Sequence, residues 1–124
     1  MKDFRDLKVW QKAHLLTLNV YRETTCFPRT EIYGLVSQMR RCSTSIGANI
    51  AVGCGKRRNN EFQRFLQIAA GSASELDYHL LLAHDLEYLN ESAYGSLLAQ
   101  LIEVRKMLAG LLQKIEHERQ TTKC

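Results

Sequence analysis

Residues 59–86 read NNEFQRFLQIAAGSASELDYHLLLAHDL, and their small and apolar side chains recur at intervals of three and four residues. This spacing places them along one side of an α-helix. The inner face predicted in this way comprises Phe62, Phe65 or Leu66, Ala69, Ala73, Leu76, Leu80, Ala83 and Leu86. Asn59 or Asn60 can cap the N–H groups of the first turn, so a long helix is predicted over about residues 60–89.

The same periodicity predicts three more helices, over about residues 7–25, 30–55 and 91–117. The first must end before Pro28, because a residue that precedes proline is pushed out of the α region. Thr30 and Asn90 can cap the second and the fourth. The polar residues from His117 onward are expected to form a frayed tail.

The predicted inner faces of these three helices are likewise apolar. They comprise Trp10, Ala13, Leu16 or Thr17, Val20, Tyr21 and Thr24; then Ile32, Leu35 or Val36, Met39, Cys42 or Ser43, Ile46, Ile50 and Gly53; and then Tyr94, Leu97/Leu98, Leu101, Val104, Leu108, Leu111/Leu112 and Ile115. Short connections between neighbouring helices favour an antiparallel up-and-down four-helix bundle, an all-α fold that occupies residues 1–124 as a single domain.

Composition fits a folded domain without a membrane segment. The chain is 45% hydrophobic and 24% charged and has one proline. Its charged N-terminus lacks an apolar signal core, and no apolar run is long enough to cross a bilayer, so we expect a cytoplasmic protein without a membrane partner. The four cysteines form no CxxC pair, which predicts reduced thiols, with Cys42 as a small core residue.

Two features indicate contacts beyond a single bundle. Apolar residues lie off the main stripes at Leu15, Leu18, Ile68, Leu81, Leu82 and Ile102, and a second apolar face suggests subunit contacts. The small-residue run 69–74, AAGSAS, suggests close approach by another backbone. That backbone belongs either to a neighbouring helix or to a neighbouring subunit.

The sequence predicts no enzyme, no cofactor and no metal. Di-iron bundles carry paired Glu-x-x-His motifs, and none of the four histidines has a glutamate three residues before it. Glu75 and His79 are four apart, and either a surface ion pair or a capped histidine is expected there. The nucleophile motif G-x-S-x-G does not occur. A phosphate loop is also absent, because Arg57 follows Lys56 where such a loop needs Ser or Thr.

Positive charge is concentrated between residues 40 and 64, which hold six bases and one acid in a chain of net charge +4. The candidate nucleic-acid-binding residues are Arg40, Arg41, Lys56, Arg57, Arg58 and Arg64, with Lys8 and Lys12 as a further strip. Such a cluster contacts phosphates, with strong salt dependence and little sequence selectivity. The alternative is a solvated helix end whose cations offset the helix dipole.

The segments FRDLKVWQKAH, FPRTEIYGLVSQMRRCSTSIGANIAVGCGKR and EFQRFLQIAAGSASELDYHLLLAHDLEYL, in this order, closely resemble the bacterial family of four-helix-bundle proteins encoded in intervening sequences of large-subunit ribosomal RNA genes. The family pattern matches at Tyr33-Gly34-Leu35, Gln38, Arg40-Arg41, Ser45-Ile46, Asn49-Ile50-Ala51, Gly53, Arg57, Phe62, Phe65-Leu66 and Gly71-Ser72. Gly47 departs from the family's usual proline and Val52 from its usual glutamate. The first change is expected to loosen the second helix, and the second makes the patch more positive.

The resemblance implies a ring-like homopentamer. It also implies a similarity to the accessory protein of diversity-generating retroelements, which binds nucleic acid and a reverse transcriptase. We therefore expect a non-enzymatic protein that binds nucleic acid, with RNA favoured. The alternative is a scaffold that recruits a partner protein and has no nucleic-acid role.

Overall fold

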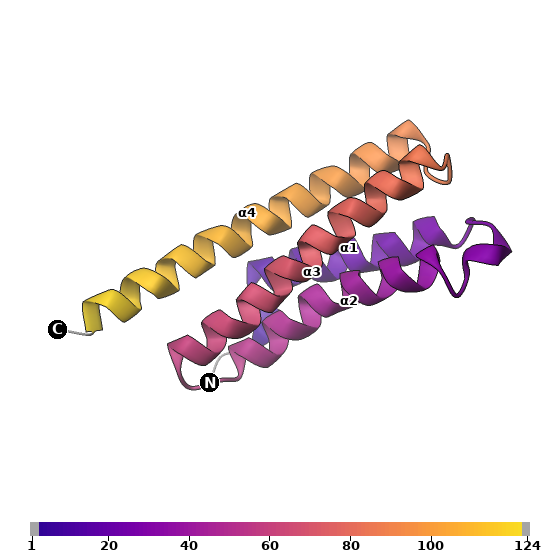
Figure 1. The fold of residues 1–124 in the computed structure, drawn as a ribbon. Helices are drawn as coiled ribbons and strands as arrows, with labels where there is room; N and C mark the ends of the chain where they lie inside the picture. The colour runs from indigo at the N-terminus through magenta and orange to yellow at the C-terminus, as the bar shows by residue number, and fades with distance from the viewer. Residues whose placement is uncertain (1–2, 123–124) are drawn as a thin grey trace.

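The computed structural model describes residues 3–122, which form four long helices and no strand (Figure 1). These helices are α1 (Lys8–Thr24), α2 (Leu35–Cys54), α3 (Asn59–Asp85) and α4 (Glu91–Thr122), with short 3₁₀ turns η1 (Phe4–Asp6) and η2 (Arg29–Glu31). The prediction of an all-α chain with four helices is confirmed. None of the helices in this part of the chain is long and apolar enough to span a membrane.

The four helices form a closed square in cross-section. α2 packs against α3, α3 against α4, α1 against α2, and α1 against α4. Among the described residues neither diagonal pair, α1 with α3 or α2 with α4, is in contact. Each helix therefore lies between its two neighbours, as an up-and-down bundle requires.

The core follows the predicted stripes closely. The fully buried large side chains are Leu16, Val20, Met39, Ile46, Ile50, Leu66, Leu76, Leu80, Leu97, Leu101, Val104 and Leu108. Three predicted core residues are wrong, because Tyr21, Ile32 and Leu86 are 43%, 54% and 45% exposed. Val9, which the sequence analysis left out, is buried instead.

The second helix begins at Leu35 and not near Thr30 as predicted. Gly34 has φ −108° and ψ −113°, outside the helical region, and separates the short turn η2 from α2. Glu31 caps the helix in place of Thr30, since its carboxylate accepts the N–H of Leu35 at 3.2 Å and the hydroxyl of Tyr88 at 3.0 Å. The bond from Tyr88 thus ties the α1–α2 connection to the α3–α4 connection.

The third helix ends at Asp85, four residues before the predicted end. Glu87 adopts a left-handed conformation with φ 64°, and the N–H of Tyr88 then bonds back to the carbonyl of Ala83 at 2.9 Å. This C-terminal cap turns the chain so that Leu89 is buried and Tyr88 packs beside Phe27 with ring centroids 5.4 Å apart.

The fourth helix continues to Thr122, so the prediction of a frayed tail from His117 is wrong for the described residues. Its start agrees with the prediction, because Asn90 accepts the N–H of Ala93 at 2.8 Å. Its last turns are held by side chains at the start of α3. Gln63 donates to Glu116 at 2.7 Å, and Asn59 donates to Glu118 at 3.3 Å.

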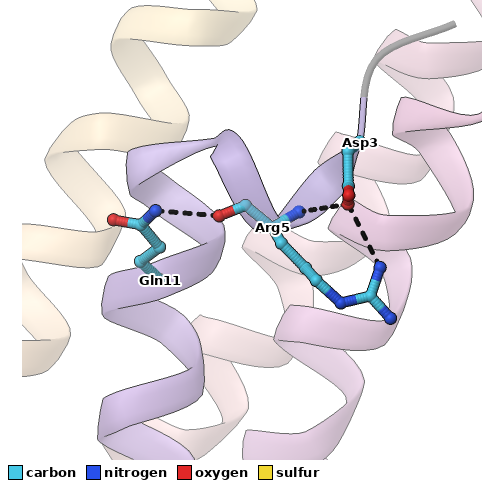
Figure 2. A network of polar contacts seen from close by, with 3 residues as sticks. All are labelled: Asp3, Arg5 and Gln11. Carbon is cyan, nitrogen blue, oxygen red and sulfur yellow. Dashed lines mark hydrogen bonds and ion pairs between the residues drawn. The ribbon is translucent and has the colours of Figure 1, made fainter.

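A small polar network fixes the chain before α1 (Figure 2). The Asp3 carboxylate accepts the backbone N–H of Arg5 at 3.0 Å and its guanidinium at 3.2 Å, while Gln11 donates to the Arg5 carbonyl at 2.8 Å. The hydrogen bond from the backbone N–H of Arg5 is the main reason that the pKa of the Asp3 carboxyl lies below its ordinary value. Turn η1 is thereby folded against α1, where Phe4 meets Trp10 edge to face.

Small residues bring α2 and α3 together. A Cβ on Gly53 would lie 2.9 Å from both Phe62 Cδ1 and Phe65 Cβ, and the hydroxyls of Ser45 and Ser72 are 2.7 Å apart. In the run 69–74, Ala69 and Ala73 are buried in the core. Gly71 differs, because a Cβ there would meet nothing within 4 Å in this chain. Packing against a neighbouring helix of the same bundle therefore accounts for the small residues at Ala69 and Ala73 but not for the one at Gly71.

The two buried glycines of α2 provide a matched pair of substitutions. Gly47→Ala should stabilise the protein by about 0.5–1 kcal/mol, because alanine is the better helix former. Its Cβ would sit 3.5 Å from Trp10 Nε1, an ordinary contact. Gly53→Ala should destabilise by about 1–3 kcal/mol, because Phe65 Cβ cannot move without shifting α3. Urea unfolding measures the change in unfolding free energy for both variants. If the two changes had the same sign, the close approach of α2 and α3 at Gly53 would be contradicted.

Candidate nucleic-acid interface

The basic residues that are close in sequence are divided between two regions of the structure. Arg40 and Arg41 lie in the first half of α2, and Lys56, Arg57 and Arg58 lie beyond its end. The thirteen residue-to-residue steps from Arg41 to Cys54 span about 20 Å of helix at about 1.5 Å per step. The interval 40–64 is therefore not one patch.

Arg40 is partly buried, and its guanidinium makes contacts within the chain. Its Nε donates to the hydroxyl of Thr24 at 3.0 Å, one terminal nitrogen donates to the carbonyl of Tyr21 at 3.3 Å, and its guanidinium lies 4.7 Å from the Tyr21 ring centroid. Thr24 is itself buried and bonds the carbonyl of Val20. These contacts fasten α2 to the end of α1 and hold the guanidinium against α1.

Arg41 is exposed beside a groove of about 820 Å³ on the α2–α3 face. A stripe of α2 residues spaced at three and four positions, namely Gln38, Cys42, Ser45 and Asn49, lines this groove opposite Ser72 and Glu75 of α3. Asn49 bonds the carbonyl of Ser45 at 2.8 Å, and the two serine hydroxyls pair. The lining mixes apolar side chains such as Ile32 and Val36 with polar ones and carries charges of both signs, so the groove does not form a continuous cationic surface.

Lys56, Arg57 and Arg58 form the connection between α2 and α3, and all three are exposed. Two cations of this region share one aromatic ring: Lys56 Nζ is 5.5 Å and Arg64 Cζ is 5.0 Å from the centroid of Phe65. Such contacts position a cation without neutralising it. We call Lys56, Arg57, Arg58 and Arg64 the loop-end cluster.

The start of α3 adds backbone donors to this cluster. Arg58 is the N-cap residue, and its side chain makes no capping hydrogen bond. The N-terminus of a helix carries a partial positive charge and free N–H groups, which together suit a phosphate or another anion. The end of α2 lies in the same connection, so the cations also complement its carbonyl groups.

A second hollow, of about 550 Å³, opens beside the loop-end cluster. Lys56 and Arg57 line it together with Leu7, which precedes α1, and with Lys114 of α4. Sequence reasoning missed Lys114, because only the fold brings the last turns of α4 to this end of the bundle. Glu118, bonded to Asn59, is the acidic residue in the same lining.

The two lysines of α1 differ in their surroundings. Lys8 is the first residue of the helix, directly after Leu7, and is exposed. Lys12 pairs with Glu103 of α4 at 3.2 Å, and both side chains are about half exposed. Lys8 therefore adds charge to the bundle end that carries the loop-end cluster, whereas the charge of Lys12 is offset.

Residues 5–110 match the protein family described as 23S rRNA-intervening sequence protein. The chain belongs to this family. Among solved structures it is similar to a protein of unknown function from the S23 ribosomal protein family of Bacteroides thetaiotaomicron, with 26% identity and a TM-score of 0.76. The alignment covers 84% of this chain and 97% of that one. No curated protein matches the chain.

Residues that carry the family resemblance occur at both sites. Those lining the α2–α3 groove are Tyr33, Gln38, Arg40, Arg41, Ser45, Asn49 and Ser72. Arg57 and Phe62 line the hollow beside the loop-end cluster. Gly47, the departure from the family's usual proline, is buried within a continuous α2 and packs near Trp10.

Cys42 and Glu75, which line the groove, lie close to His79, and these three side chains are able to ligate a metal. Cys42 Sγ lies 3.6 Å from Nδ1 of His79, and Glu75 Oε2 lies 4.0 Å from Nε2 of the same histidine. Burial, together with the nearby Glu75 carboxylate, raises the pKa of the Cys42 thiol to about 12. The spacing of Glu75 and His79 is visible in the sequence, but nothing in the sequence indicates that Cys42 lies beside them.

The neighbouring arginines of α2 should respond differently to the same substitution. Arg40→Gln removes two hydrogen bonds and a cation–π contact and should destabilise the protein by about 1–2 kcal/mol. Arg41→Gln should change stability by less than about 0.5 kcal/mol, because its side chain is exposed. Urea unfolding compares the two. An equal loss in both would mean that Arg40 does not fasten α2 to α1.

Proposed function

We propose that this protein binds nucleic acid without catalysing a reaction, with RNA as the favoured ligand. The loop-end cluster supplies the contacts, which go to the phosphate backbone. The observation that carries the proposal is that Arg57 and Arg58 are exposed and, within residues 3–122, form no ion pair. Membership of a family associated with 23S ribosomal RNA genes supports the choice of RNA.

The arrangement favours phosphate contacts over base stacking. Arg57, Arg58 and the free N–H groups of α3 are donors that suit phosphate oxygens. The aromatic rings nearby, Phe62 and Phe65, are partly buried, and Lys56 and Arg64 lie over Phe65. A ring that is covered in this way cannot serve as a platform for an unstacked base. Structured or duplex RNA or DNA is therefore favoured over single strands.

Charge reversal at the cluster should weaken binding while leaving the fold intact. We expect Arg57→Glu with Arg58→Glu to lower the affinity for ribosomal RNA fragments at least about tenfold at low salt, because phosphate contacts dominate affinity. The wild-type affinity should fall steeply as salt rises. Fluorescence anisotropy at several salt concentrations measures both effects, with duplex DNA and an acidic protein as comparison ligands.

A control with the same change in net charge is available elsewhere on the surface. Arg29, in the connection between α1 and α2, and Lys106, in the middle of α4, are both exposed. Arg29→Glu with Lys106→Glu should reduce binding much less than the loop-end variant. Equal losses would show a general charge effect. Absence of RNA binding at low salt, together with binding of the acidic protein, would favour the alternative scaffold function.

We also propose that the protein acts as a homo-oligomer, and the family resemblance suggests a ring-like pentamer. Large apolar side chains remain exposed on several helices: Leu15 and Leu18 at 48% and 39%, Ile68 and Leu81 at 43% each, and Ile102 at 44%. Gly71 lies on the outer side of α3 with open space above it. A copy of the same chain could cover these surfaces, and it would repeat the loop-end cluster around the assembly.

Mass measurement tests self-association directly. Five chains of 14.2 kDa have a mass of about 71 kDa, and light scattering across dilution should report a species near this value. Leu18→Glu with Leu81→Glu should shift it to a lower mass without loss of helix content by circular dichroism, because both residues are exposed in the single chain. A species near 14 kDa at micromolar wild-type concentration would contradict the proposal.

A further inference from the structure

We propose that Cys42, Glu75 and His79 form a binding site for a divalent transition-metal ion of the zinc class. The site lies at the seam between α2 and α3. It combines a thiol, a carboxylate and an imidazole, which are the three side-chain types that bind zinc in proteins. It lies in the first half of α2, apart from the loop-end cluster, and does not depend on nucleic-acid binding.

The distances suit a common ion. The 3.6 Å between Cys42 Sγ and His79 Nδ1 is close to the separation of roughly 3.5 Å expected for sulfur and nitrogen ligands bound tetrahedrally at about 2.3 and 2.0 Å. One ligand atom from each of the three residues lies within 4.8 Å of the other two. The carboxylate of Glu75, which lies 4.0 Å from Nε2 of His79 and is about half exposed, has to rotate toward Nδ1 for all three side chains to reach one ion.

The backbone presents these ligands from two helices that are fixed against each other. Glu75 and His79 are four residues apart on α3 and so share one face, separated by one turn. Cys42 faces them from α2. The hydrogen bond between Ser45 and Ser72, at 2.7 Å, holds the two helices together one turn further along. Most of the ordering that binding requires is thus already present in the fold.

The site is accessible from solvent. Cys42 and Glu75 both line the α2–α3 groove, and the exposed fraction rises from 3% at Cys42 through 13% for the His79 side chain to 52% for that of Glu75. An ion can therefore enter through the groove. Three protein ligands leave the fourth tetrahedral position for a water molecule from the groove.

Charge and proton balance are both satisfied. A thiolate and a carboxylate together neutralise a dication, and His79 binds through a neutral Nδ1 with its proton on Nε2. The thiol proton passes to solvent when the ion binds, so one proton is released for each ion. The contacts of Arg40 with Thr24 and Tyr21 hold that nearby cation on α1. Arg41 also lines the groove, and its side chain is exposed to water.

The donor set selects the class of ion. Thiolate and imidazole favour zinc and its neighbours over magnesium and calcium, which prefer oxygen ligands. Cobalt(II) can replace zinc and reports a thiolate ligand through its charge-transfer absorption. We therefore expect the metal-free full-length protein to bind one cobalt ion per chain, with this absorption and visible bands of tetrahedral cobalt. Added zinc should displace cobalt and abolish the bands.

Cysteine variants locate the thiolate. Cys42→Ser should abolish the charge-transfer absorption, whereas Cys26→Ser should leave it unchanged, because Cys26 is exposed in the α1–α2 connection. His79→Gln retains the thiol and should weaken cobalt binding by at least about tenfold, since loss of even an outer-shell partner costs about 10–100-fold. Circular dichroism checks that each variant is folded.

Three results would overturn the proposal. These are a wild-type protein that binds no cobalt or zinc, a charge-transfer band that persists in folded Cys42→Ser, or a band that is lost in Cys26→Ser. Because Cys42 is buried, the Cys42→Ser variant could unfold. In that case the cobalt affinity of the folded His79→Gln variant tests the site. Unchanged cobalt affinity in His79→Gln contradicts the site. Loss of RNA binding by the loop-end variant bears on the proposed function alone.

Discussion

The close packing of α2 against α3 determines where the other features of this protein lie. Gly53 leaves room for Phe62 and Phe65, and the hydroxyls of Ser45 and Ser72 pair across the interface. A larger residue at Gly53 would push α3 away at the point where the chain turns. Both candidate sites depend on this contact, because one lies in the turn and the other lies along the seam.

The two sites should nevertheless act independently. About 20 Å of helix separates Arg41 from the end of α2, and the two hollows that mark the sites share no lining residue. Substitutions that are more than about 7–10 Å apart and have no common partner usually have additive effects. Coupling between an ion at Cys42 and a ligand at Arg57 would therefore require movement of α2 as a whole. The contacts of Arg40 with α1 oppose such movement.

The sequence was sufficient to predict the helices and most of the core, because a periodicity of 3.6 residues is a local property. It failed at the start of α2 and at the ends of α3 and α4, and distant side chains decide two of these three positions. The start of α2 depends on Glu31, which also bonds Tyr88 from 57 positions away, and the last turns of α4 depend on Gln63. Exposure of Ile32 follows from the same displaced start.

The candidate sites were predictable only in part, for a related reason. Adjacent positions on a helix point in different directions, and residues a dozen apart lie far from each other along its axis. Arg40 and Arg41 therefore have different surroundings, and neither lies beside Lys56. The connection 55–58 keeps its basic residues together because it is short. Cys42 and His79 are 37 positions apart, so only the antiparallel pairing of α2 and α3 could bring them together.

Electrostatic screening explains why the end of the bundle suits a polyanion better than the groove does. The Debye length at physiological salt is about 8 Å, so charges act together only when they are close. Lys56, Arg57 and Arg58 are consecutive and exposed, and Arg64 lies over the same ring as Lys56. In the groove, Arg40 is held by α1, and Arg41 lines the same groove as Glu75. A phosphate chain would therefore meet several cations at the loop end, and repetition of that end in an oligomer would add further contacts through multivalency.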